Sequence, residues 1–220
     1  SSDKTIKLWK IGERRLKKTF KAHTKSVLSL AFYTDEKILA SGSQDTSIIL
    51  WDMQEGKPTK TLMGHTKAVW ALQETRKGTL ISGSEDCLIK IWDIKNCTCI
   101  QTIHGHKDTI YNILSFNDDK NIITCSDDET LRVWEVDDGI CVQVVKGHEK
   151  GVRCLAINSE ETLVASGGYD QCLRIWNLKT MKQLKVRDKN DGVIRGVKFF
   201  DDYSVLYTDK HVKLFKLNIA

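Results

Sequence analysis

The sequence predicts an all-β fold built from repeated units, because its motifs recur about every 42 residues and its apolar runs are short and rich in β-branched residues. One large aromatic residue closes an apolar run in each repeat, at successive steps of 42, 41, 42, 42 and 39 residues. These residues are Trp9, Trp51, Trp92, Trp134, Trp176 and Phe215. An aspartate precedes each by six residues, at Asp3, Asp45, Asp86, Asp128, Asp170 and Asp209.

One repeat, residues 65–105, illustrates the expected unit. Apolar runs at 68–72, 79–84, 88–92 and 99–103 predict four strands, and the Gly, Asp, Asn and Ser residues between them favour tight turns. A single four-stranded antiparallel sheet leaves its faces uncovered, whereas copies stacked around an axis cover each other. The repeat therefore predicts a β-propeller of four-stranded antiparallel blades.

A histidine and a hydroxyl residue recur with the aspartate in four repeats. The histidine lies 21 or 22 residues before the aspartate, and the Ser or Thr lies four residues before it. The sets are His23/Ser41/Asp45, His65/Ser82/Asp86, His106/Thr124/Asp128 and His148/Ser166/Asp170. These residue types also form hydrolytic triads. A catalytic site is usually needed once, however, while a structural connection is needed in every repeat, so we interpret the sets as structural and expect no catalytic residue.

Gly-His and Trp-Asp pairs mark the same repeats. They are Gly64-His65, Gly105-His106, Gly147-His148, Trp51-Asp52 and Trp92-Asp93. Through these motifs the chain resembles the WD-repeat (WD40) β-propeller family over essentially its whole length. The resemblance implies that each set is a hydrogen-bonded tetrad, in which the carboxylate holds the histidine, the histidine reaches the hydroxyl, and the hydroxyl meets the indole N–H of Trp51, Trp92, Trp134 or Trp176.

The sixth repeat departs most from this pattern. Asn190 stands where the histidine is expected, Val205 where the hydroxyl residue is expected, and Phe215 in place of the tryptophan. We expect that blade to lack the polar network and to be looser.

We expect residues 1–220 to form one propeller segment about five blades long. The predicted ranges are a partial blade at 1–21, full blades at about 22–63, 64–104, 105–146 and 147–187, and a partial blade at 188–220. The resemblance implies a ring that usually has seven blades. The remaining blades are then expected from residues outside this chain or from a partner.

Composition gives no sign of a cofactor, metal or membrane span. The seven cysteines lack paired metal-ligand spacing, there is no Gly-rich phosphate loop, and no apolar run approaches the roughly 18 residues of a membrane helix. We interpret the cysteines as free thiols in a reducing, intracellular and most simply cytoplasmic setting. The net charge is +5, part of it in Arg14, Arg15, Lys17, Lys18 and Lys21. That stretch is compatible with contact to nucleic acid or an acidic partner. We favour the simpler interpretation that it is a solvated, charged edge strand.

In the family resembled, the face that carries the histidine loops and aspartate turns often receives peptides near the central channel. The resemblance places these side chains at its entrance: Leu28, Trp70, Tyr111, Arg153 and Arg195, with Tyr169 just before a turn aspartate. Trp, Tyr and Arg often dominate interface energies, and paired arginines suit a carboxylate or phosphate. The alternative is that the aromatic residues only fill the channel mouth while the arginines are solvated or paired with Asp127.

The functional hypothesis is a non-catalytic scaffold that docks proteins or peptides, including acidic or phosphorylated ones, on this face and on the rim. A sharper version is a ubiquitin-ligase-type substrate receptor, although no adaptor segment is present in the sequence. The second class is a structural subunit of a cytoskeletal, ciliary or ribonucleoprotein particle. An enzyme is the least favoured class.

Overall fold

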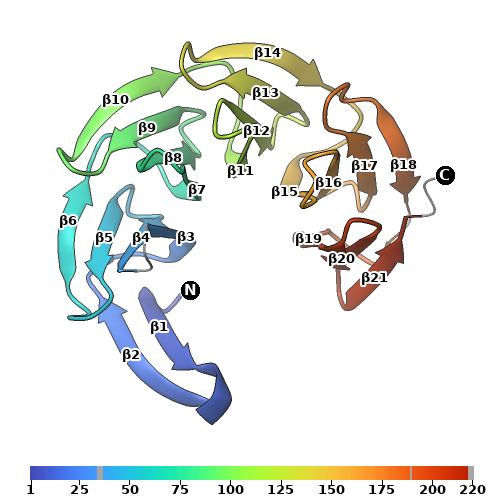
Figure 1. Ribbon diagram of the computed structural model, residues 1–220. Helices are drawn as coiled ribbons and strands as arrows, with labels where there is room; N and C mark the ends of the chain where they lie inside the picture. The colour runs from blue at the N-terminus through green and yellow to red at the C-terminus, as the bar shows by residue number, and fades with distance from the viewer. Residues whose placement is uncertain (34–36, 189, 218–220) are drawn as a thin grey trace. The chain divides into compact units, whose positions relative to one another are not determined.

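The computed structural model describes residues 1–33, 37–188 and 190–217. In these residues the regular structure is β-strand, apart from one 3-10 turn, η1 (Ile11–Glu13). Twenty-one strands form six antiparallel sheets, and in each sheet the strands pair in sequence order (Figure 1). The predicted all-β fold of four-stranded, propeller-type blades is confirmed. The chain divides into two compact units, Ser1–His104 and Gly105–Ala220, which are described separately.

The first unit contains one two-stranded sheet and two four-stranded sheets. The two-stranded sheet is β1 (Thr5–Lys10) and β2 (Arg15–Lys21). The next is β3 (Val27–Tyr33), β4 (Ile38–Ser43), β5 (Ile48–Asp52) and β6 (Pro58–Leu62). The third is β7 (Val69–Glu74), β8 (Thr79–Ser84), β9 (Ile89–Asp93) and β10 (Thr98–Ile103).

The second unit contains two four-stranded sheets and one three-stranded sheet. The first is β11 (Ile110–Phe116), β12 (Asn121–Ser126), β13 (Leu131–Glu135) and β14 (Ile140–Val145). The second is β15 (Val152–Ile157), β16 (Leu163–Gly168), β17 (Leu173–Asn177) and β18 (Gln183–Arg187). The third is β19 (Gly196–Asp201), β20 (Ser204–Thr208) and β21 (Val212–Lys216).

Burial differs systematically between strands of one sheet. The second strands β8 and β16 are buried almost throughout, whereas the last strand β14 alternates between exposed and covered residues. Alternating burial is typical of a strand with one face in water. Continuous burial is typical of a strand that is covered on both faces. The tryptophans on the third strands of the four-stranded sheets are buried. Trp92 packs with Leu50 and Val69 in the first unit, and Trp176 packs with Val133 and Leu155 in the second.

Neighbouring sheets within a unit approach closely where a second strand carries glycine. A Cβ on Gly167 of β16 would lie 2.4 Å from Ile194 Cγ2, just before β19. In the first unit, a Cβ on Gly42 of β4 would lie 2.7 Å from Val69 Cγ1 of β7. The absent side chain therefore leaves room for the first strand of the next sheet.

We predict that Gly167→Ala lowers the free energy of unfolding by about 1–3 kcal/mol, the usual cost of an overpacked core. Gly192→Ala is the matched control, because its Cβ would lie 3.6 Å from the nearest heavy atom, an ordinary contact. Urea unfolding of both variants measures the difference. Equal midpoints for the two variants would contradict the close approach of the sheets.

Candidate functional site

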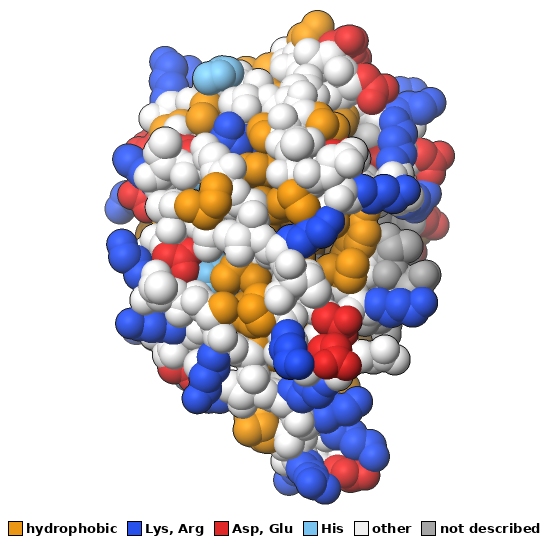
Figure 2. Space-filling model, turned by 90° about the vertical axis from the view of Figure 1, so that its left-hand side faces the viewer, with side chains coloured by type: hydrophobic (Ala, Val, Ile, Leu, Met, Phe, Trp, Pro, Cys, Tyr) orange, Lys and Arg blue, Asp and Glu red, His pale blue; other side chains and the backbone are white. Residues whose placement is uncertain are grey.

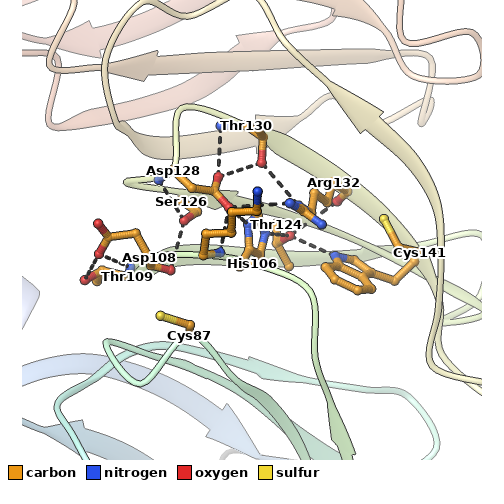
Figure 3. A network of polar contacts seen from close by, with 12 residues as sticks. Cys87, His106, Asp108, Thr109, Thr124, Ser126, Asp128, Thr130, Arg132 and Cys141 are labelled. Atoms are coloured by element: carbon orange, nitrogen blue, oxygen red, sulfur yellow. Dashed lines mark hydrogen bonds and ion pairs between the residues drawn. The ribbon is translucent and has the colours of Figure 1, made fainter.

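The structure brings together the four members of each predicted tetrad. In every set histidine Nδ1 lies 2.7–2.9 Å from an aspartate oxygen, histidine Nε2 lies 2.7 Å from the hydroxyl oxygen, and the indole N–H donates to that oxygen at 2.7–2.9 Å. Figure 3 shows the set in which His106 lies between Asp128 and Thr124. The indole of Trp134 completes it.

The proton positions in a tetrad follow from the donors available. A carboxylate only accepts, so histidine Nδ1–H donates to it, and Nε2 of the neutral ring accepts the hydroxyl proton. The hydroxyl oxygen then accepts the indole N–H. Burial, the largest influence, lowers the pKa of His106, and it outweighs the opposing effect of Asp128, while Arg132 also lowers it. The neutral ring is therefore favoured in this tetrad.

The aspartate also fixes the turn between the second and third strands. One oxygen of Asp86 accepts the backbone N–H of Thr66 at 2.9 Å, and the other accepts that of Leu88 at 3.1 Å. The other three tetrad aspartates make the same two bonds. Cys87, between Asp86 and Leu88, has a left-handed backbone with φ 68°. That backbone conformation is uncommon for residues other than glycine. The hydrogen bonds of the carboxylate therefore stabilise a turn that the residue at this position does not itself favour.

A second hydroxyl, which we did not single out from the sequence, belongs to this arrangement. Ser84 Oγ accepts the backbone N–H of Asp86 at 3.1 Å and donates to Lys67 O at 3.3 Å. Ser43 and Ser126 make the equivalent bonds. The signal was a serine two residues before the aspartate in three of the four sets.

The tetrad hydroxyls are closed off from solvent. Ser41, Ser82, Thr124 and Ser166 have no exposed surface. A nucleophile needs access to substrate, so the burial favours a structural role over a hydrolytic one. Among the described residues no group of three or more His, Cys, Asp or Glu could hold a metal ion. The described part of the chain also has no helix with the length and apolarity to cross a membrane.

The sheet of the sixth repeat departs from our expectation. Val205 pairs with Phe215, just as Leu80 pairs with Trp92 in a complete blade, so the hydroxyl position lies two residues beyond Val205, at Tyr207. The turn between β20 and β21 is shorter than the equivalent turns of the complete blades. Counting four residues back from Asp209 therefore gave Val205 and missed Tyr207. Tyr207 is buried, and its hydroxyl donates to Asn190 Oδ1 at 3.0 Å.

This sheet therefore has a reduced polar connection in place of a tetrad. Asn190 also donates to Gln171 O at 2.7 Å and to Arg187 O at 3.1 Å. The Arg187 guanidinium lies 5.7 Å from the Tyr207 ring centroid and 5.6 Å from that of Phe215. The amide and the phenol take over the roles of the histidine and the small hydroxyl residue, and the arginine covers both rings.

In the second unit, predicted docking residues from two adjacent sheets contact one another. Arg153, at the start of β15, places its guanidinium 4.6 Å from the ring centroid of Tyr111 on β11 and 5.9 Å from that of Tyr169. The two tyrosine rings lie 6.2 Å apart, tilted by 58°. Arg153 also donates to the Tyr169 hydroxyl at 3.4 Å. We call Tyr111, Arg153 and Tyr169 the Tyr–Arg–Tyr cluster.

Asp127 borders this cluster. It accepts a hydrogen bond from the Tyr111 hydroxyl at 3.4 Å. Its pKa is raised by burial and by the nearby charge of Asp108, against the opposing effects of Tyr111 and Arg153. The pKa of Tyr111 is raised by burial, by its hydrogen bond to Tyr169 and by Asp127, so the phenol stays neutral.

Gly151 makes room for Asp127. A Cβ on this residue would lie 1.9 Å from Asp127 Oδ1, and the equivalent positions in the other repeats carry Ser26, Ala68, Thr109 and Val193. The glycine before β15 is thus a further residue of the site.

Three more docking residues were predicted from the sequence, namely Arg195, Leu28 and Trp70. Arg195, just before β19, is exposed, and no side-chain partner of its guanidinium is found among the described residues. Leu28 on β3 and Trp70 on β7 are half-buried and belong to the first unit. They hold the position in their strands that Tyr111 and Arg153 hold in β11 and β15.

The basic stretch of the first unit, apart from Arg14, forms β2, and the one strand that pairs with β2 among the described residues is β1, as expected for an edge strand. Lys and Arg side chains gather at the lower end of the molecule in Figure 2, where the turn between β1 and β2 lies. Lys18 donates to the backbone oxygens of Met53 and Gln54. The other basic side chains of the stretch, Arg14, Arg15, Lys17 and Lys21, are exposed.

We predict that Asp86→Ala lowers the free energy of unfolding by about 1–3 kcal/mol, because it leaves buried groups without their partner. Glu85→Ala is the control, since it removes the same charge from the adjacent position of the same turn. Urea unfolding should separate the two variants. A change in Asp86→Ala no larger than in Glu85→Ala would show that the tetrad adds no stability.

Acidification should lower stability in two stages. The folded pKa of His106 lies below its ordinary value of about 6.5, so the unfolded chain takes up protons first and stability falls as the pH drops below that value. For Asp86, burial opposes ionisation, but hydrogen bonds from His65 and from the backbone of Thr66 hold its pKa at about 2. Its contribution is complete above an ordinary carboxyl pKa of about 3.9 and is lost as the pH falls toward 2.

Urea midpoints between pH 7 and pH 5 test the first stage. They should fall for the wild type, and the fall should be shallower for His106→Asn, because asparagine does not titrate. A wild-type midpoint that stays level or rises over this range would contradict the prediction.

Comparison with known proteins agrees with this geometry. The family model described as "WD domain, G-beta repeat" matches residues 14–52, 56–93, 97–135 and 139–177. A search of curated proteins found no match. The four matched segments cover more than half of the chain, and each ends one residue after a tetrad tryptophan. The chain belongs to the WD-repeat family.

Proposed function

We propose that this chain docks partner proteins through the face that carries its tetrad-held turns, and that it binds acidic or phosphorylated segments there. WD repeats generally mediate protein–protein interaction and are generally non-catalytic. The finer assignment rests on the Tyr–Arg–Tyr cluster of the second unit. We further propose that the chain works inside the cell.

The observation that carries the proposal is the stacking of Arg153 on Tyr111 at 4.6 Å. An arginine held over an aromatic ring has lost much of its rotational freedom before a ligand arrives, so less entropy is lost on binding. Its planar guanidinium suits a carboxylate or a phosphate, which can accept two parallel N–H bonds. Arg195, exposed at the equivalent position of the next sheet, would supply a second cation.

The tetrads support this role by fixing the turns that border the cluster. Tyr169 directly precedes the tetrad residue Asp170, and Asp127 directly precedes Asp128. Asp127 adds a selective element. Its carboxylate lies beside Tyr111, so an incoming anion is favoured close to Arg153 and disfavoured elsewhere in the cluster.

A second candidate is a structural subunit of a larger assembly, which one observation favours. The last strands of the second unit carry half-exposed apolar side chains, Val142 and Val144 on β14 and Leu184 and Val186 on β18. Apolar side chains in such numbers often mark contact surfaces. This role would use the rim and is compatible with peptide docking at the cluster.

Fluorescence anisotropy with a labelled phosphoserine peptide rich in Glu tests the proposal. We predict that Arg153→Ala/Arg195→Ala weakens binding by about tenfold or more, as expected when interface arginines are removed. Arg153→Lys should fall between the wild type and the double variant, because it keeps the charge but loses the planar stacking.

Lys150→Ala removes an exposed charge from the loop before β15 and serves as the matched control. It should bind like the wild type. Equal affinity of the wild type and the double arginine variant would overturn the proposal, and so would an equal loss in Lys150→Ala.

A further inference from the structure

The second unit carries a groove at the other end of its first strands. β11, β15 and β19 begin beside Tyr111, Arg153 and Arg195, and their later residues line this groove. It has a volume of about 610 Å³, within the range of roughly 300–1,000 Å³ typical of binding pockets. The docking function proposed above does not use it.

The wall of the groove is largely apolar. Side chains that contribute to it are Leu114, Leu155, Ile157, Val197, Phe199 and Phe200. Phe200 is 70% exposed. Phe199 pairs with Val205 and Asp201 with Ser204, so the bulge between them leaves Phe200 unpaired. A large aromatic side chain held in water beside an apolar groove marks a contact surface.

The groove is bordered mainly by carboxylates. Glu161, Asp201 and Asp202 line it, and Lys198 is the one basic residue that does so among the described residues. Glu160, in the same turn as Glu161, adds a further exposed carboxylate. A partner segment with positive charges would therefore be electrostatically complementary.

Hydrogen bonds between turns hold this border in place. Glu161 accepts the backbone N–H of Asn117 at 2.8 Å, which links the turns after β15 and β11. Ser159 donates to Asp202 at 2.7 Å, which links the turns after β15 and β19. A carboxylate has about four lone-pair sites, so each can accept a further bond from a ligand. Because the border is ordered beforehand, binding costs less entropy.

We propose that this groove binds a segment of a partner protein in which Lys or Arg residues flank an apolar side chain. The apolar side chain packs against Phe200 and the groove wall, while the flanking cations pair with Asp201, Asp202 and Glu161. A protein segment is favoured over nucleic acid because these carboxylates repel phosphates. This groove favours cationic segments, whereas the Tyr–Arg–Tyr cluster is proposed to bind anionic ones, so one unit can hold two different partners.

Fluorescence anisotropy with the full chain tests the groove. The probe is a short labelled peptide in which Lys and Arg residues flank a Phe-Leu pair. Phe200→Ser and Asp201→Lys/Asp202→Lys should each weaken binding by about tenfold or more, because they remove the apolar contact or reverse the charge. Asp201→Asn/Asp202→Asn keeps the hydrogen-bond acceptors and should weaken binding less than the charge reversal does.

Two controls separate the groove from general surface effects. Tyr203→Ser removes an exposed aromatic residue from the turn directly after β19, and this residue does not line the groove. Asp137→Lys/Asp138→Lys reverses the same number of charges at a different hollow. Both controls should bind like the wild type, and so should Arg153→Ala/Arg195→Ala. The proposal is overturned if the wild type does not bind the probe, if the groove variants keep its affinity, or if the controls lose as much.

Discussion

The hydrogen-bonded chain from carboxylate to histidine to hydroxyl to indole is the constraint on which each complete blade depends. It links the loop before the first strand, the second strand, the turn after it, and the tryptophan of the third strand. Buried polar groups are costly unless they are paired, so one arrangement of these segments satisfies the chain and looser ones do not. The same carboxylate fixes a turn in which Cys87 and its equivalents Thr46, Glu129 and Gln171 adopt positive φ.

The repeat made much of this predictable. The strands of residues 65–105 and the recurring His, Ser or Thr, and Asp sets could be inferred from spacing, because a residue needed once per blade recurs once per period. That each set bonds to a tryptophan as a tetrad was implied by the resemblance to WD repeats. Where one repeat is shorter than the others, counting residues from the aspartate assigns the wrong position. The shortened turn after β20 moved the hydroxyl position from Val205 to Tyr207, and only the strand pairing shows that shift. The recurring serines such as Ser84 were visible in the sequence, but their role follows from bonds to two backbone groups.

The sequence predicts candidate docking residues by their position in the repeat, and it does not predict which of them contact one another. Equivalent places in the strands pointed to Tyr111 and Arg153, yet the stacking of one on the other depends on how adjacent sheets pack. Gly151 shows the same limit, because a missing side chain gives no chemical signal until its neighbour Asp127 is located. The groove at the other end of the strands likewise depends on a bulge at Phe200 and on bonds between turns that lie far apart in the sequence.

The tetrads hold the Tyr–Arg–Tyr cluster in position for the proposed docking, since Tyr169 and Asp127 lie in turns whose aspartates belong to tetrads. Hydrogen–deuterium exchange of the full chain, with and without the acidic phosphopeptide, tests this most directly. We predict added protection in the segments around Tyr111, Arg153, Tyr169 and Arg195 in the wild type, and loss of that protection around Tyr169 in Asp170→Ala. Protection confined to other segments, or unchanged protection at Tyr169 in Asp170→Ala, would contradict the account.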